Sequence, residues 1–382
     1  MEAYLLDWLS LLLRWAHVIV GIAWIGASFY FIWLDNHLEA ARDPALAGEL
    51  WAIHGGGFYR VEKYRLAPAQ LPSLLHWFKW EAYWTWITGF ALLAAMYYAN
   101  AGIYLVDPAV MPLSTWAAIG IGIGFLVVSY AIYEGLCRSP LGRNEVLLST
   151  AIFFLLVLAA WGLTRVFGGR GAFIHYGAML GTIMAANVAH IIIPGQRRMV
   201  AAVSEGRAPD AKDAVMGKQR SVHNTYFTLP AVFTMISGHY PMTWHWLALV
   251  ALTLAGALVR VWFVMRHKGR APIWVLLSGI ALIGAAALML KPKSEPAGPP
   301  VSFDEVKRVI DARCVSCHAE KPSFQGLTEA PKGVKLDSPE RIRAQRAQIH
   351  QQTVLARAMP PGNLTGMSDV ERVLLDHWAR MK

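Results

Sequence analysis

The sequence predicts an all-α protein, an eight-helix transmembrane bundle followed by a small all-α domain. Hydrophobic residues make up 55% of the 382 residues and charged residues only 16%, against about 25% charged in an ordinary soluble domain. The apolar residues stand in long blocks, each near the roughly 20 residues that cross a bilayer as a helix. Residues 291–300, with four prolines, predict a stiff linker to a C-terminal domain, residues 301–382.

Eight apolar blocks within residues 1–290 are the predicted spans. They lie at about 8–34, 76–99, 115–136, 146–167, 172–194, 222–240, 242–265 and 273–290. The first block contains Arg14 and His17 and has neither a basic leader nor a small-residue cleavage site. We therefore interpret it as a spanning helix and not as a signal peptide. A polar segment, residues 35–73, separates the first two spans.

Basic residues are concentrated in alternate loops, after the first, third, fifth and seventh spans. They are Arg42, Arg60, Lys63, Arg65, Arg138, Arg143, Arg197, Arg198, Arg207, Lys212, Lys218, Arg220, Arg266, Lys268 and Arg270. The other loops have almost none apart from Arg165 and Arg170. The positive-inside rule puts the basic loops in the cytoplasm and both termini outside it. The net charge of +10 thus reflects a lipid bilayer as the partner, and we expect no nucleic acid.

The C-terminal domain contains the run CVSCH at residues 314–318, the C-x-x-C-H pattern of covalent c-type haem attachment. One helical turn presents both thiols to the porphyrin, and the adjacent histidine reaches the iron from one side. A zinc site is the alternative, but zinc needs two further ligands, and His350 and His377 are not spaced as a pair. The predicted haem c ligands in this run are Cys314, Cys317 and His318.

A sixth iron ligand is expected further along the chain. Met359 is favoured because it lies in a loop held rigid by Pro360 and Pro361, and because His/Met ligation raises the potential. Met367 is the rival candidate. Ser368 predicts the N-cap of a last helix. Together these features resemble a small class I cytochrome c domain, which identifies an electron carrier but not a reaction.

Polar side chains inside the spans are the candidates for a second site, because an unpaired ionisable group is costly in hydrocarbon. For any single histidine, a buried, hydrogen-bonded side chain is the plainer interpretation, but their number favours a site. Those nearer the cytoplasmic face are His76, Glu81, Glu134, Asn187, His190, His223 and Asn224. Those nearer the outer face are His17, His175, His239 and His245. The Trp-rich second span, which includes Trp84, suits either an interfacial belt or an aromatic wall for a planar substrate.

A b-type haem held between two spans is an alternative use of these histidines. His175 and His190 are fifteen residues apart, about 60° in helical phase, so they share a face. His223 and His239 are sixteen apart, about 160°, which fits only if Pro230 kinks the helix. One pair fits and the other does not, so the sequence leaves an intramembrane haem b open.

Several runs carry a resemblance to a known family: His17 to Gly26, His54 to Tyr64, Trp77 to Gly89 and His223 to Pro241. With the C-x-x-C-H run, they resemble the integral-membrane, cytochrome c-type urate oxidases (urate hydroxylases) of bacteria. The resemblance implies a purine-catabolic oxidoreductase that converts urate to 5-hydroxyisourate with oxygen from water. It also implies electron transfer through the haem to a soluble cytochrome c or terminal oxidase. The location it implies is the inner (cytoplasmic) membrane, with both termini and the cytochrome c domain periplasmic.

The chemistry of urate suggests which polar residues serve it. Urate is a planar anion at neutral pH, so its pocket needs N–H donors or cations, aromatic stacking and a base. We predict catalytic roles for His17, Glu81 and His190. The predicted substrate-binding residues are His76, Trp84, His175, His223 and His239. An outer site would lie close to the haem, whereas an inner site would need a relay, because the hydrocarbon core is about 30 Å thick.

Two other functions remain open from the sequence. A haem-carrying subunit of a quinol-oxidising respiratory complex would show quinol-driven haem reduction. A transporter with a redox-sensing cytochrome domain would move substrate without reducing the haem. The chain shows neither histidines spaced like a haem–copper oxidase nor an internal inverted repeat.

Overall fold

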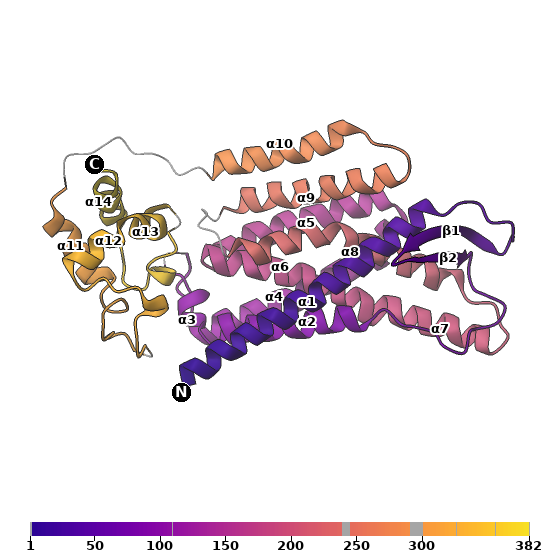
Figure 1. Ribbon diagram of the computed structural model, residues 1–382, viewed down its shortest axis with the longest axis horizontal. Helices are drawn as coiled ribbons and strands as arrows, with labels where there is room; N and C mark the ends of the chain where they lie inside the picture. Colours follow the sequence, from indigo (N-terminus) through magenta and orange to yellow (C-terminus); the bar gives the residue numbers. More distant parts are fainter. Residues whose placement is uncertain are drawn as a thin grey trace.

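Long antiparallel helices form most of the structure (Figure 1). The computed structural model describes residues 2–108, 110–238, 245–290, 301–325, 327–355 and 357–381. Short π-helical turns interrupt two of the long helices. The bundle elements are α1 (Glu2–His37), α2 (Trp80–Leu93), η1 (Ala94–Tyr98), α3 (Ala101–Tyr104), α4 (Thr115–Arg138), η2 (Pro140–Arg143), α5 (Glu145–Val166), α6 (Gly169–Ala186), η3 (Asn187–Ile192), α7 (Ile193–Ser204), α8 (Ala211–Ser237), α9 (Trp246–His267) and α10 (Ile273–Met289).

Five segments of the described residues are long and apolar enough to cross a membrane. They are Trp8–His37, Thr115–Arg138, Glu145–Val166, Gly169–Ser204 and Trp246–His267. A shorter apolar helix, Ile273–Met289, follows them. Helices also occupy the predicted second and sixth spans, but α2 ends after 14 residues in a π turn, and α8 carries several charged side chains. The structure therefore supports five candidate spans, and the full eight-span bundle stays a prediction. The predicted linker, residues 291–300, lies outside the described residues.

A β-hairpin follows α1, so the prediction of an all-α chain is wrong at this point. Strands β1 (Leu46–His54) and β2 (Gly57–Tyr64) pair antiparallel, with His54 opposite Gly57. Gly55 and Gly56 form the turn with φ of 58° and 84°, the left-handed values that a two-residue type I′ turn requires at both positions. Glycine adopts these values without a steric penalty. The polar segment predicted for residues 35–73 thus contains ordered strands.

The two ends of the bundle differ in what they carry (Figure 1). The hairpin and α7 lie at one end, and the connections after α1, α4, α7 and α9 turn at this same end. The predicted basic residues lie in these connections, in the hairpin, and in the helices beside them. A bond from Gln219 Nε2 to the carbonyl of Gly142, 3.0 Å, ties η2 to α8 there. Short helix α3 and the C-terminal domain lie at the opposite end. We call these the hairpin end and the α3 end.

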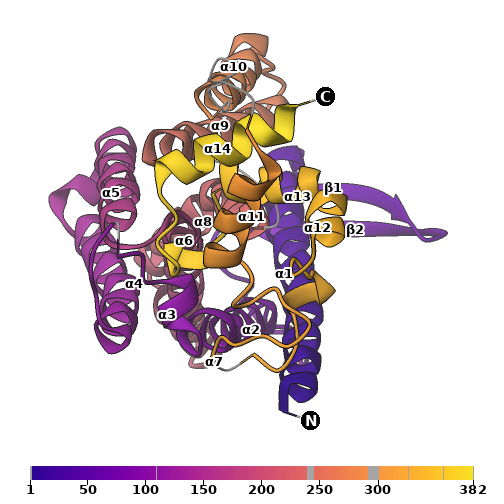
Figure 2. The ribbon, with the colours of Figure 1, turned by 90° about the vertical axis from the view of Figure 1, so that its left-hand side faces the viewer.

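The C-terminal domain is a small helical unit. When the protein is viewed from the α3 end, the helices of this domain lie in front of the bundle (Figure 2). Its hydrophobic core includes Val306, Ile310, Leu375 and Trp378, all buried. Capping boxes begin its first and last helices, and the second confirms Ser368 as an N-cap. Its elements are α11 (Phe303–Arg313), η4 (Pro331–Gly333), α12 (Pro339–Ala344), α13 (Arg346–Ile349), η5 (His350–Leu355), η6 (Pro361–Asn363) and α14 (Asp369–Arg380).

The C-terminal domain contacts the bundle where η6 lies against α3. Gly362, with φ of 55°, is so close to the chain beyond α3 that a Cβ there would lie 2.7 Å from the carbonyl oxygen of Val106. Only glycine combines this backbone conformation with this clearance. The loop that carries Met359 is therefore next to the segment that docks the domain on the bundle.

Candidate functional site

The C-x-x-C-H run has the local geometry that a c-type haem needs. Helix α11 ends at Arg313, and the N–H groups of Cys314 and His318 close successive turns on the carbonyls of Ile310 (2.8 Å) and Cys314 (2.9 Å). The Nδ1 atom of His318 donates to the carbonyl of Val334 at 2.9 Å. That bond fixes the ring and leaves Nε2 as the nitrogen that can bind iron. The residues present therefore fit a haem c.

The two cysteines differ in exposure. Cys314 is buried in the core of the C-terminal domain, and Cys317 is half-buried. Burial raises the pKa of the Cys314 thiol to about 12, so the thiol is uncharged at neutral pH. His350, one of the candidates weighed as a zinc ligand, is instead held by Asp376, with 2.7 Å from Nε2 to Oδ1. In the described part of the chain, no group of three or more His, Cys, Asp or Glu side chains is arranged around a metal position.

The two candidate methionines occupy different environments. Met367 is 3% exposed and packs in the domain core. Its N–H donates to Oδ1 of Asn363 (3.0 Å), and its carbonyl accepts from Nδ2 of the same residue (3.1 Å). Met359 is half-buried, and its carbonyl accepts from Arg372 at 3.1 Å. Met359 stays the predicted sixth ligand, since Met367 already serves the core.

Within the bundle, five buried side chains from α4, η3 and α8 form what we call the inner polar cluster. Its members are Tyr133, Asn187, Arg220, His223 and Asn224. Tyr133 Oη lies 2.8 Å from His223 Nδ1 and accepts from Asn187 Nδ2 at 3.0 Å. Asn187 Nδ2 also donates to Asn224 Oδ1 at 2.9 Å. The π turn η3 brings Asn187 to this position, and such turns are frequent at functional sites.

Charge in the inner polar cluster is balanced by one carboxylate. Arg220, whose side chain is 2% exposed, lies with Nη2 2.9 Å from Oε2 of Glu134. Its guanidinium also lies over the ring of Tyr133, 5.2 Å from the centroid. Four buried atoms of the cluster have no hydrogen-bond partner: Asn187 Oδ1, Arg220 Nε, Arg220 Nη1 and His223 Nε2. They offer donors and an acceptor, the mixture that a planar heterocycle with N–H and C=O groups can satisfy.

Two of the predicted histidines lie nearer the α3 end. His17 packs between α1 and α2, with Nδ1 3.1 Å from Thr88 Oγ1. His175 is fully buried. Its Nδ1 donates to the carbonyl of Gly171 (2.8 Å), and Nε2 lies 3.2 Å from Tyr98 Oη. A Cβ on Gly122 would be 2.6 Å from that Nε2. Both nitrogens of His175 are thus engaged in a closely packed setting.

His175 does not fit an iron ligand in this arrangement, because both of its ring nitrogens already have partners, and no role below depends on a haem b. His190 is exposed on η3 and has Nδ1 3.0 Å from Tyr130 Oη. The haem b alternative, which pairs these two histidines, stays a prediction. His239 lies outside the described residues.

The other predicted residues surround α2. Glu81 is half-buried, Trp84 is 50% exposed, and His76 is exposed in the segment before α2, with its ring 4.7 Å from that of Phe78. Ala82 packs against Val188 of η3, which makes α2 and η3 neighbours. Within the described residues, no hydrogen bond joins two of the predicted histidines. The structure thus brings His223 into the inner polar cluster and leaves the others with separate partners.

Tyr133, Arg220 and Arg260 are not among the site residues predicted from the sequence. Arg220 was counted only as a loop residue, although its spacing of three and four from His223 and Asn224 on one helix was a signal. Arg260 stands alone in an apolar span, which is itself a functional signal. Tyr133 gave no signal, because a tyrosine in an apolar block is ordinary.

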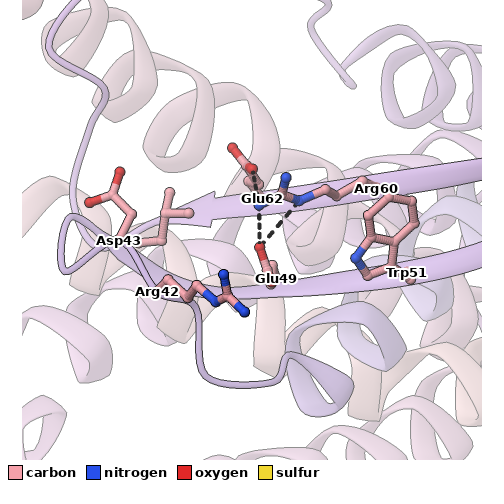
Figure 3. Close-up of a pocket in the computed structure, with 7 residues that line it drawn as sticks. Arg42, Asp43, Glu49, Trp51, Arg60 and Glu62 are labelled. Carbon is pink, nitrogen blue, oxygen red and sulfur yellow. Dashed lines mark hydrogen bonds and ion pairs between the residues drawn. The ribbon is translucent and has the colours of Figure 1, made fainter.

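One surface hollow lies on the hairpin (Figure 3) and does not include any predicted site residue. Arg60 is paired there with Glu49 (2.6 Å) and Glu62 (3.0 Å). The three acidic residues in its lining outnumber the two arginines, so it does not favour an anion. The lining residues are Arg42, Asp43, Leu46, Glu49, Trp51, Arg60 and Glu62.

These features define a predominantly helical protein with several helices suited to a membrane, buried polar groups in the bundle and a C-x-x-C-H domain. Residues 3–291 match the family model described as Urate oxidase N-terminal, and the chain belongs to that family. The match supports a urate-related oxidoreductase function and ends before the C-terminal domain. No curated protein and no solved structure was found to match the chain.

Proposed function

We propose that the protein is a membrane-bound urate oxidase that hydroxylates urate to 5-hydroxyisourate with water as the oxygen source. The match of residues 3–291 to the urate oxidase family carries this proposal. In the balanced reaction, urate and one water give 5-hydroxyisourate, two protons and two electrons. The chain therefore has to bind a planar anion, accept protons and pass electrons to an acceptor.

Residues of the C-terminal domain would hold the electron acceptor. Cys314 and Cys317 would hold a haem c through thioether bonds, and His318, through Nε2, and Met359 would bind its iron. When bound there, a haem c supplies a one-electron acceptor outside the bundle. The ring of His318, fixed by its bond to Val334, supports this assignment, as does the contact of η6 with the bundle.

Proton transfer is assigned to side chains near α2 and η3. His17, Glu81 and His190 are the proposed bases, and Glu81 has no side-chain partner in the described part of the chain. His76, Trp84, His175, His223 and His239 are the proposed substrate-binding residues. Of these, His223 has a buried Nε2 without a hydrogen bond, 3.8 Å from Oε2 of Glu145, and this nitrogen can hydrogen-bond a heterocycle.

The proposed location is the bacterial inner membrane, with the C-terminal domain in the periplasm. The basic loops turn at the hairpin end, and the C-terminal domain lies at the α3 end. The positive-inside rule assigns the hairpin end to the cytoplasm. A soluble cytochrome c or a terminal oxidase would then take the electrons.

An anaerobic visible spectrum of the oxidised, purified protein, recorded before and after urate is added, tests the proposal. Reduced c-type bands without peroxide are expected. Replacing both Cys314 and Cys317 by serine should abolish covalent haem and urate oxidation together. Undiminished urate oxidation in the double variant would contradict the proposed electron path. Haem reduction by a quinol but not by urate would instead favour the respiratory-subunit alternative, and urate uptake into vesicles without haem reduction would favour the transporter.

A further inference from the structure

Among the described residues, Arg260 of α9 is a buried cation for which no carboxylate partner is present. It is 4% exposed, and its Nε and Nη2 atoms have no hydrogen-bond partner. The guanidinium lies against the ring of Phe29 on α1, 3.8 Å from the ring centroid. Tyr226 on α8 is close enough to interact with it electrostatically. Three helices thus enclose one face of a guanidinium whose donors are unused.

The comparison with Arg220 shows why this arrangement is unusual. Both arginines are almost completely buried, but Arg220 has Glu134 at 2.9 Å. No ion pair of Arg260 occurs among the described residues, and the imidazole of His267 on the same helix adds a titratable base rather than an acid. An uncompensated guanidinium in a low-dielectric bundle is costly. An anion at this position would remove most of that cost.

The unpaired atoms also define the shape of the anion. Nε and Nη2 lie on the same edge of the planar guanidinium and point their N–H groups in parallel, the arrangement that grips two neighbouring acceptor atoms at once. Phe29 lies against a face of the guanidinium, and the two nitrogens of that edge are buried without a hydrogen-bond partner among the described residues. A planar, delocalised organic anion with adjacent O and N acceptors matches this edge better than a spherical ion does.

We propose that Arg260 is the anion-binding residue of the urate site, gripping the urate monoanion through Nε–H and Nη2–H between α1, α8 and α9. This inference rests on the proposed function, because it takes urate as the ligand. It adds a substrate-recognition residue to the histidines proposed above. Arg260 holds and orients the anion, and proton transfer is left to other side chains.

The test measures equilibrium binding of radiolabelled urate to detergent-solubilised protein whose haem has been reduced with dithionite under nitrogen, so that no turnover occurs. Arg260→Gln should weaken binding about 10- to 100-fold, the loss expected for a bidentate, charge-assisted contact. Arg260→Lys, which keeps the charge but loses the fork, should weaken it by less. Arg266→Gln is the matched control, since Arg266 is exposed one turn and a half further along α9. Unchanged affinity in Arg260→Gln would overturn the inference.

A second measurement needs no variant and covers the case in which the substitutions prevent folding. In the native protein, urate should slow the modification of Arg260 by phenylglyoxal, mapped by mass spectrometry, and leave that of Arg266 unchanged. Equal modification of Arg260 with and without urate would overturn the inference, as would equal protection by sodium chloride at the same concentration. If the native protein does not oxidise urate, the proposed function fails. If the native protein oxidises urate but urate does not change the modification of Arg260, only this inference fails.

Discussion

The ion pair between Arg220 and Glu134 makes a stability prediction with a built-in comparison. Glu134 receives two arginines: Nη2 of Arg220 at 2.9 Å from Oε2, and Nε of Arg138 at 2.5 Å from Oε1. The Arg220 side chain is 2% exposed and the Arg138 side chain 65%. Glu134→Gln leaves a buried guanidinium without its counter-charge, which costs about 3–5 kcal/mol. Arg138→Gln breaks a solvent-screened pair worth about 0–1 kcal/mol.

A double variant separates the charge from the rest of the side chain. Glu134→Gln combined with Arg220→Met removes both charges, and replacing a buried pair by apolar groups is often nearly neutral. The double variant should therefore be more stable than Glu134→Gln alone, with a coupling energy of about 1–3 kcal/mol.

The measurement is the free energy of unfolding in mixed micelles titrated with sodium dodecyl sulfate and followed by helical circular dichroism. The visible absorbance of the proposed haem c would report separately whether the C-terminal domain stays intact. Equal destabilisation by Glu134→Gln and Arg138→Gln would refute the argument, since it would mean that burial does not set the strength of these pairs. A double variant less stable than either single one would refute it as well.

Three further predictions concern the C-terminal domain. Gly362→Ala should slow haem reduction by urate in stopped-flow traces without moving the haem potential, because a Cβ would lie 2.7 Å from the Val106 carbonyl at a position with φ of 55°. Met359→Ala should lower the haem reduction potential in a spectroelectrochemical titration, because it removes the proposed methionine ligand. Met367→Ala, at a core position 3% exposed, should instead mainly lower the stability of the domain, by about 2–5 kcal/mol. Acid should destabilise the same domain through Glu371. Burial alone would raise the pKa of Glu371, but hydrogen bonds from Ser368 and Arg313 lower it overall. The stability that the Glu371 carboxylate contributes is therefore present above pH about 4.3 and is lost as the pH falls through the lower pKa of the folded state. Glu371→Gln should flatten that loss in thermal melts between neutral pH and pH 3.

The sequence predicted where helices lie better than it predicted which of them are long and apolar. Apolar blocks identify helices because a backbone in hydrocarbon must satisfy its own hydrogen bonds. They do not reveal that α2 changes to a π turn after 14 residues. The hairpin was not predicted because only long apolar blocks were interpreted as ordered elements. Alternating apolar and polar residues on both sides of Gly55-Gly56, a recognised type I′ turn signal, do indicate a hairpin. The N-cap at Ser368 was predicted, since capping depends only on neighbouring residues.

The candidate sites likewise include residues that the sequence alone could predict and residues that it could not. The candidate haem-binding residues Cys314, Cys317 and His318 could be proposed from the sequence because their spacing is local. The inner polar cluster was not assembled beforehand, because Tyr133 and His223 are joined by a hydrogen bond across 90 residues of sequence. No periodicity encodes which face of α4 meets which face of α8. Arg260 belongs with the features that a sequence can signal, since one arginine inside an apolar span already demands an explanation.

The length of the bundle constrains how the proposed reaction can work. Arg260 lies fourteen residues beyond the start of α9 at Trp246, or about 21 Å along the axis toward the hairpin end, whereas the haem motif lies beyond the α3 end. One long electron jump over that distance is inefficient. Aromatic rings in contact cover part of the path: Trp86 stacks on Phe90 at 5.4 Å, and Phe90 meets Tyr98 at 6.4 Å. These contacts run along α2 and η1 toward α3, where η6 docks. Several short electron-transfer steps along them can therefore connect a urate site in the hairpin half of the bundle to the C-terminal domain.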